Sequence, residues 1–225
     1  MKTHWQQYLN IEQLLREAKP RAVLELGALL GENSHNLATL GGEIGYHLTI
    51  VSDDVLPDLS DVPEWVTLHQ GVSYRVLPTL TGPYDVVLLD TDHNYYTLMR
   101  ELDALDPLLP VGAQVIIHDV EAFYYDPGFM PGYADGSSYP RDEIVASTVY
   151  GSLGTGLIDF LATHKRGYRL VRWIPEGCGV AVIRKNPVPL MVTVTWPVSW
   201  SDQDPTRALT LLLSTPDTEG RKVDS

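Results

Sequence analysis

Short apolar runs alternate along the chain with segments in which apolar residues recur every three or four positions. Uninterrupted runs of this kind are typical of parallel strands covered on both faces. Five such runs precede residue 120, at 22–27, 47–52, 66–69, 84–89 and 114–117. Helical periodicity lies before or between them, over residues 5–18, 33–40 and about 95–109. The alternation predicts a doubly wound parallel sheet.

The last of these predicted helices has one clear apolar face. Its leucines, spaced by four, three and four residues, are Leu98, Leu102, Leu105 and Leu109. Such spacing places them along one side of a helix, which we expect to be buried. The other side is predicted to be a solvated surface that carries Arg100, Glu101 and Asp103.

After the fifth run the pattern changes. Residues 120–143 combine aromatic side chains with glycine and proline, which favours a lid or a binding loop. A further helix is predicted from about residue 153 to 164, and runs at 168–174 and 180–184 predict a closing antiparallel hairpin. The expected fold is therefore an α/β domain with a mostly parallel seven-stranded sheet.

We place this domain at residues 1–187 and a C-terminal extension at residues 188–225. The extension contains two strand-like runs, at 190–195 and 208–214, before a polar end that we expect to be disordered. The two runs could extend the sheet or pair with a second subunit, so a homo-oligomer is an open possibility.

Charge and composition restrict the classes of partner. Acidic residues exceed basic ones by 29 to 16, a formal charge of −13, and no Lys and Arg cluster is present to bind nucleic acid or an anionic membrane. The single cysteine, Cys178, is interpreted as a packing residue. No signal peptide or membrane span is apparent, and we expect a cytoplasmic protein with a small-molecule partner.

A glycine-bearing turn follows the first predicted strand. Glu25 lies in that strand, Gly27 ends it and Gly31 opens the next helix. Ligands bind at this edge of parallel sheets, and the Gly-x-x-x-Gly spacing differs from the Gly-x-Gly-x-x-Gly of dinucleotide sites. A carboxylate nearby suits the ammonium and sulfonium groups of S-adenosylmethionine (SAM). A plain strand–helix turn and a nicotinamide site are the alternatives.

An acidic residue at the end of the second strand narrows these alternatives. Asp53 follows Gly27 by 26 residues, where a carboxylate accepts hydrogen bonds from a ribose diol. The adjacent Asp54 is equally well placed by spacing. A ribose-bearing ligand is therefore expected, with SAM favoured over a nicotinamide cofactor.

At this point the sequence resembles a known family. The segment Val23–Gly27 with Gly31 and Ser34 looks like the first motif of class I SAM-dependent methyltransferases. The segments 84–95, 108–112 and 116–119 extend the resemblance to the subgroup that contains cephalosporin-hydroxylase-like proteins and macrolide-sugar O-methyltransferases. It covers residues of about 20–185 and implies a Rossmann-like fold. We count Ser34 and Asp90 with the cofactor-binding residues.

One position departs from the family pattern. The family often has Gly-Asp-Ser, with the acid near the adenine amino group, where this chain has Gly71-Val72-Ser73. The adenine pocket is therefore expected to use Ser73 or backbone atoms.

A second group of polar residues follows the fourth and fifth strands. Asp90, Asp92 and His93 follow one strand, and His118 and Asp119 end the other. If the strands are neighbours, their carboxyl ends bring these side chains together. We expect a divalent metal, Mg²⁺ first among the candidates, on Asp92, His118 and Asp119. Carboxylates suit Mg²⁺, whereas a histidine ligand favours Mn²⁺ or Zn²⁺.

Two of these residues also have a purely structural interpretation. Asp92 could cap the helix that begins near Asn94, and His118 could be a packed, hydrogen-bonded histidine. The resemblance implies an arrangement in which the acid of the Asp-His pair binds a metal together with acids that end the next strand.

The sequence thus predicts a SAM-dependent O-methyltransferase that acts on a hydroxyl of a small molecule such as a sugar or a natural-product glycoside. His93 is the expected base, and Asp92 with a divalent metal would activate the hydroxyl. The alternatives are a non-methyltransferase enzyme on the same scaffold, such as a hydroxylase-associated protein, and a non-catalytic SAM-binding or assembly module.

Overall fold

The computed structural model describes residues 4–28, 32–53, 62–120, 153–163, 167–175 and 179–187, and the side chains within them apart from those of residues 4–9 and 32. The predicted lid, the C-terminal extension, Gly31, Asp54 and Cys178 lie outside these residues.

A seven-stranded sheet forms the centre of the domain, in the order β3-β2-β1-β4-β5-β7-β6. The first five strands are parallel, and β7 runs antiparallel to both β5 and β6. Their bounds are β1 Ala22–Leu26, β2 His47–Ser52, β3 Val66–Gln70, β4 Val86–Leu89, β5 Gln114–His118, β6 Tyr168–Ile174 and β7 Val180–Lys185. The predicted fold class and closing hairpin are confirmed.

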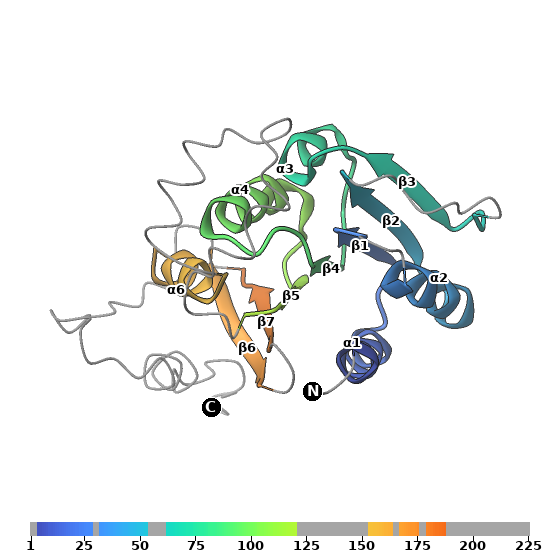
Figure 1. Ribbon diagram of the computed structural model, residues 1–225, viewed down its shortest axis with the longest axis horizontal. Helices are drawn as coiled ribbons and strands as arrows, with labels where there is room; N and C mark the ends of the chain where they lie inside the picture. The colour runs from blue at the N-terminus through green and yellow to red at the C-terminus, as the bar shows by residue number, and fades with distance from the viewer. Residues whose placement is uncertain are drawn as a thin grey trace, which may run out of the picture.

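Helices cover both faces of the sheet (Figure 1). The helices α1 and α2 lie on one face, and α3, α4 and α6 lie on the other. Their bounds are α1 His4–Ala18, α2 Glu32–Ile44, α3 Ser73–Val76, α4 Tyr95–Leu105 and α6 Leu153–Thr163, with 3₁₀ turns at Leu77–Thr79 and Asp106–Leu108. None of the helices within the described ranges is long and apolar enough to cross a membrane.

The strands bury alternate residues in two separate cores. In β4, Val87 and Leu89 pack with α4 and α6, whereas Val86 and Leu88 pack on the side of α1 and α2. A strand whose successive side chains point to opposite faces must be apolar throughout when both faces are covered. This requirement explains why the buried strands are uninterrupted apolar runs.

Two differences from the predicted elements have a clear physical reason. Strand β4 begins at Val86, because the amide of Tyr84 donates to the carbonyl of Leu108 in a 3₁₀ turn instead of to a strand. The short helix α3 was not predicted, since four residues carry too little periodicity to be recognised.

Candidate active site

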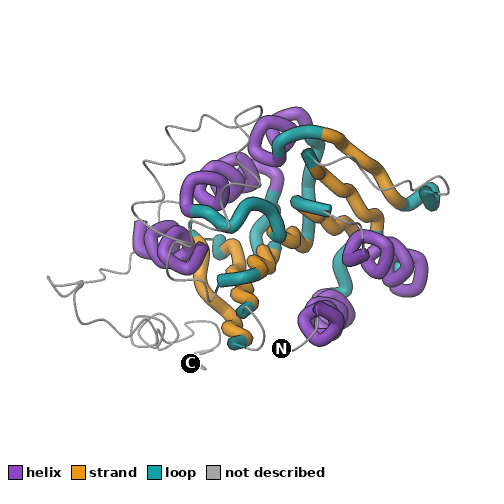
Figure 2. The backbone as a smooth tube through the Cα atoms, viewed as in Figure 1, coloured by secondary structure: helices purple, strands orange, loops and turns teal. Residues whose placement is uncertain are grey.

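The residues directly after β1, β2, β4 and β5 lie at the carboxyl edge of the sheet (Figure 2). Gly27 lies at their centre with a φ of +88°, a conformation that suits glycine. A Cβ atom on Gly27 would lie 2.1 Å from the carbonyl oxygen of Asp90. The amide of Gly27 donates to the carbonyl of Val51 at 2.9 Å. Gly27 is therefore required for the close approach of β1 to the end of β4, and its own amide is occupied within the sheet.

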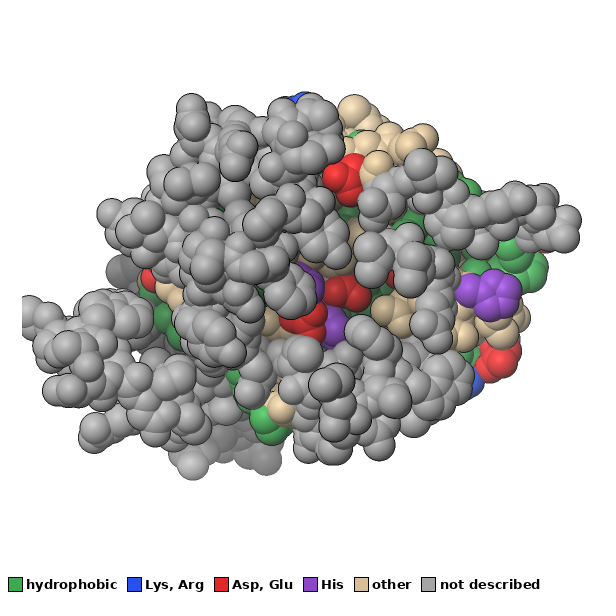
Figure 3. All heavy atoms as spheres, in the orientation of Figure 1, with side chains coloured by type: hydrophobic (Ala, Val, Ile, Leu, Met, Phe, Trp, Pro, Cys, Tyr) green, Lys and Arg blue, Asp and Glu red, His purple; other side chains and the backbone are tan. Residues whose placement is uncertain are grey.

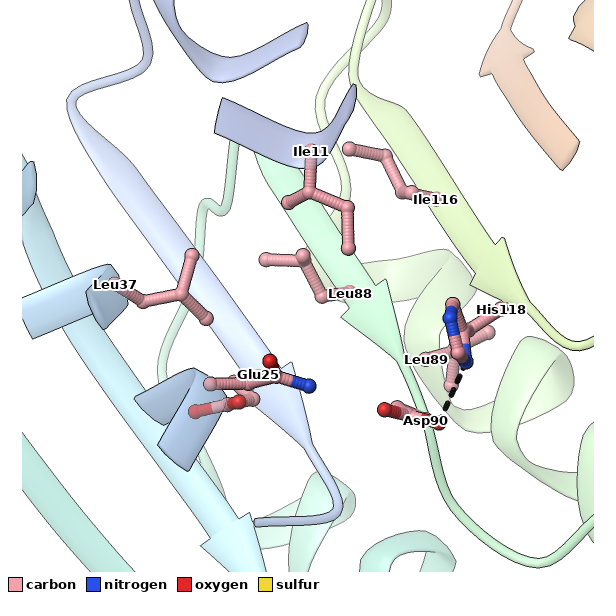
Figure 4. A pocket seen from close by; sticks show the side chains of 9 residues that line it. Ile11, Glu25, Leu37, Leu88, Leu89, Asp90, Ile116 and His118 are labelled. Carbon is pink, nitrogen blue, oxygen red and sulfur yellow. Dashed lines mark hydrogen bonds and ion pairs between the residues drawn. The ribbon is translucent and has the colours of Figure 1, made fainter. Parts of the chain in front are cut away.

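Glu25, Asp90 and His118 line a small cavity at this edge (Figure 4), and Ser34 is buried at the start of α2. Glu25 is 2% exposed, and burial raises the pKa of its carboxyl to about 8, with the Asp90 charge adding to the effect of burial and the Ser34 hydroxyl opposing it. The Oε2 atom of Glu25 and the Oγ atom of Ser34 have no hydrogen-bond partner among the described residues. Buried polar atoms are normally satisfied, so these two atoms are suited to a polar ligand group.

The end of β2 lies beside this cavity. The hydroxyl of Ser52 accepts a long hydrogen bond of 3.4 Å from the amide of Ala28, and its carbonyl accepts a 2.8 Å bond from Gly71 at the end of β3. Asp53, the next residue, is exposed. Asp53, the residue predicted to bind the ribose, thus lies at the carboxyl edge and is accessible to solvent.

Two aspartates and two histidines form a cluster where β4 and β5 end. Nδ1 of His118 lies 3.1 Å from Oδ1 of Asp90 and 3.1 Å from Oδ1 of Asp119. Nε2 of His93 lies 3.1 Å from Oδ2 of Asp119 and 3.7 Å from Oδ1 of Asp90. Acidic and histidine side chains are visible together near the centre of the face drawn in Figure 3. Ligand atoms of Asp90, His93 and Asp119 lie close enough to hold one metal ion.

Opposite charges stabilise the ionised forms of this cluster. Burial disfavours a charge on His118, but hydrogen bonds to Asp119 and Asp90 outweigh burial and raise its pKa to about 10. Burial also acts against the ionised form of Asp90, yet the two histidines hold the pKa of this carboxyl well below its usual range. The pKa of His93 is raised for the same reason as that of His118. The site therefore attracts positive charge.

The backbone at Asp119 is itself unusual. Its φ is +57°, in the left-handed region that residues other than glycine rarely adopt, although aspartate does so more readily than most. Such conformations cost energy and cluster at functional sites. In this conformation the carboxylate of Asp119 contacts both histidines.

Among the described residues, the group close enough to hold one ion is Asp90, His93 and Asp119, and it does not include Asp92. Asp92 is buried at 8% exposure, and its charge acts on Glu101. The side chain of Asn94 accepts a hydrogen bond from the amide of Thr97 at 2.8 Å and caps α4. The cap considered for Asp92 is thus supplied by Asn94. Asp90, which the sequence assigned to the cofactor, lies in the same cluster as Asp119, and an oxygen of each is 3.1 Å from Nδ1 of His118.

Glu101 is the residue that the sequence interpretation placed wrongly. It was expected on the solvated side of α4 but is 1% exposed, whereas Arg100 and Asp103 are exposed as predicted. Its carboxylate accepts hydrogen bonds from the hydroxyls of Ser73 and of Thr91, the latter at 2.9 Å. Residues 98, 101 and 105 share one helix face, and this spacing was a signal that could have revealed the burial.

The strand order β3-β2-β1-β4-β5-β7-β6 with an antiparallel closing hairpin is the class I SAM-dependent methyltransferase architecture. A family model described as a methyltransferase domain matches residues 7–120, slightly more than half of the chain. The chain therefore belongs to this methyltransferase family. No curated protein sequence matches it.

Solved structures are similar in fold at low sequence identity. SAH-bound PaMTH1 from Podospora anserina is 17% identical, covering 83% of this chain and 80% of that one, with a TM-score of 0.58. The O-methyltransferase TomG from Streptomyces achromogenes, in complex with SAM, is 19% identical with 82% coverage of each chain and a TM-score of 0.58. MycE from the mycinamycin pathway, in complex with Mg, SAH and mycinamycin VI, is 19% identical, covering 84% of this chain and 51% of that one, with a TM-score of 0.53.

Proposed function

We propose that this methyltransferase transfers the methyl group of SAM to a hydroxyl oxygen of a small molecule, with the help of a divalent metal. The observation that carries the proposal is the cluster of Asp90, His93, His118 and Asp119, which lies beside the cavity of Glu25. A methyl donor and an activated oxygen must meet for the reaction, and positioning of two reactants contributes much of the rate of such transfers.

The cofactor would lie over the carboxyl edge of β1 and β2. The Oε2 atom of Glu25 has no partner among the described residues and can accept a hydrogen bond, and the ammonium group of SAM is a donor. A cation there would also favour the ionised form of the buried Glu25. Asp53 is the candidate for the ribose hydroxyls, and Gly31 is assigned to the same site on sequence grounds.

The donor set of the cluster fits a divalent metal. The carboxylates of Asp90 and Asp119 would supply oxygen ligands, and His118, whose Nδ1 lies 3.1 Å from both acids, would supply the nitrogen ligand, while His93 is kept for the proton transfer. Because histidine is present where some relatives have an acid, Mn²⁺ or Zn²⁺ is favoured over Mg²⁺. Such an ion, when bound, lowers the pKa of a substrate hydroxyl and orients it.

His93 is the candidate general base. Its side chain is 24% exposed, whereas that of His118 is 9% exposed and contacts both aspartates. Of the two histidines His93 is thus the more accessible to an acceptor. Asp119 at 3.1 Å orients its ring, the arrangement in which a carboxylate prepares an imidazole to take a proton.

For the acceptor we propose a sugar or a natural-product glycoside. Support comes from the resemblance to macrolide-sugar O-methyltransferases and from the similarity of fold to MycE, whose structure contains mycinamycin VI. The formal charge of −13 favours a neutral or cationic acceptor over an anionic one.

The test is transfer of an isotopically labelled methyl group from SAM to a panel of hydroxylated small molecules, with and without a chelator. We expect label on oxygen in at least one sugar-bearing acceptor and a loss of the signal with the chelator, restored by Mn²⁺. Label on nitrogen or carbon would overturn the proposed reaction, and full activity with the chelator would overturn the metal. Methyltransferase family membership favours this function over a non-methyltransferase enzyme or an assembly module.

A further inference from the structure

Glu101 is a buried carboxyl group that joins two loops of the cofactor edge. One hydrogen bond comes from Ser73, the first residue of α3 after β3, and the other comes from Thr91, which follows Asp90 at the end of β4. The three residues are far apart in the sequence, and only the packing of α4 under both loops brings them together.

If stability were the only requirement, a carboxyl group at this buried position would be unfavourable. Leu98 and Leu105 flank it on the same helix face and are fully buried, so an apolar side chain would suit the position. Burial raises the pKa of Glu101 to about 8, and the charges of Asp92 and Asp53 raise it further while the hydroxyls of Ser73 and Thr91 oppose them. The benefit of a carboxyl here must therefore lie in the hydroxyls that it holds.

The backbone pairing of β2 and β3 brings Ser73 towards Asp53, the residue predicted to bind the ribose. The backbone of Gly71, two residues before Ser73, is bonded to Ser52, the residue before Asp53. In a nucleoside the base is attached directly to the ribose, so the base of a cofactor held at Asp53 falls within the region of Ser73 and Thr91.

We propose that Glu101 is a positioning residue, which orients the hydroxyls of Ser73 and Thr91 so that the site selects the amino group of adenine. This inference rests on the SAM site proposed above. A hydroxyl has one hydrogen, and when it donates that hydrogen to Glu101 its oxygen lone pairs are left for a donor on the ligand. The amino group of adenine is such a donor.

The test compares the affinity for S-adenosylhomocysteine (SAH) with that for its analogue in which hydrogen replaces the adenine amino group. Calorimetry on the full-length wild type is expected to show a preference for SAH of about tenfold, the value of one net hydrogen bond. Glu101→Leu, which packs against Leu98 and Leu105, and the double variant Ser73→Ala with Thr91→Val should bind both ligands about equally. Glu101→Gln keeps an oxygen acceptor and should retain most of the preference.

A purely structural role would give a different result. It would weaken both ligands by the same factor in Glu101→Leu, leaving the preference unchanged, and this outcome would overturn the inference. Loss of the preference in Glu101→Gln as complete as in Glu101→Leu would also overturn it. Asp103→Asn, an exposed acid on the same helix, is the matched control and should behave as wild type. Absence of SAH binding in the wild type would instead refute the proposed SAM site itself.

Discussion

His118 at the end of β5 lies with its Nδ1 atom 3.1 Å from Oδ1 of Asp90, which follows β4. The pairing of Leu89 with Ile117 sets this distance, because in parallel strands the next residues along each chain are then also opposite one another. The same imidazole nitrogen is 3.1 Å from Asp119. The imidazole of His118 therefore lies between two acids. The first two predictions concern a metal ion bound by these groups.

Removing either carboxylate charge should destroy the metal site, and the Asp119 variant should do so without affecting the cofactor. We predict that Asp90→Asn and Asp119→Asn lower the affinity for Mn²⁺ by about 100-fold or more, since even loss of an indirect partner of a metal ligand costs 10–100-fold. Metal-stimulated methyl transfer should fall accordingly. Titration calorimetry with Mn²⁺ and with SAH measures both properties. Wild-type metal affinity in both variants would show that the cluster is not the metal site.

The histidine at position 118 should set which metal is bound. His118→Glu replaces a nitrogen ligand by an oxygen ligand, and we predict a shift in preference from Mn²⁺ or Zn²⁺ towards Mg²⁺. The measurement is the ratio of the dissociation constants for Mn²⁺ and Mg²⁺ in the variant and the wild type. An unchanged ratio would mean that His118 packs beside the site without acting as a ligand.

Gly27 tests how tightly the turn after β1 is packed. Gly27→Ala should lower the free energy of unfolding by more than the roughly 1–2 kcal/mol that a left-handed conformation costs a residue with a side chain, because its Cβ would also collide with the carbonyl of Asp90. Gly112→Ala is the matched control, since Gly112 has a φ of +90° but open space around the Cβ position. Chemical denaturation measures the two losses, and equal losses would mean that the turn yields to the added methyl group.

Glu101 should make the protein less stable as the pH rises. Its pKa is about 8 in the folded protein against about 4.5 in the unfolded chain, so in this interval the folded state binds more protons. The stabilising contribution is therefore complete below about pH 4.5 and is lost as the pH rises through about 8. We predict that the free energy of unfolding of wild type declines from pH 6 to pH 9 and that Glu101→Gln reduces the decline.

Part of the decline should remain in that variant, because Glu25 has a pKa of about 8 as well. The control is Asp103→Asn on the exposed side of α4, which should follow the wild-type profile. An identical slope for wild type and Glu101→Gln would show that the carboxyl of Glu101 titrates normally in the folded protein.

The sequence predicted the sheet well, because a strand buried on both faces must be apolar at every position. The same apolar runs located the ends of β1, β2, β4 and β5, and with them the polar residues of the site. The choice between Asp90 and Asp92 depended on strand register, which the apolar pattern leaves undetermined. The spacing of Glu101 from Leu98 and Leu105 indicates a buried position, but its partners, Ser73 and Thr91, come from two other loops and could not be predicted from the helix.

The most direct test of the central claim is the transfer of a trideuterated methyl group from SAM by wild type and Asp119→Asn, with products analysed by mass spectrometry and NMR. We predict label on a hydroxyl oxygen of a glycosidic acceptor with wild type and Mn²⁺, and no label with Asp119→Asn although that variant still binds SAH. Label on an atom other than oxygen, or equal labelling by both proteins, would contradict this account.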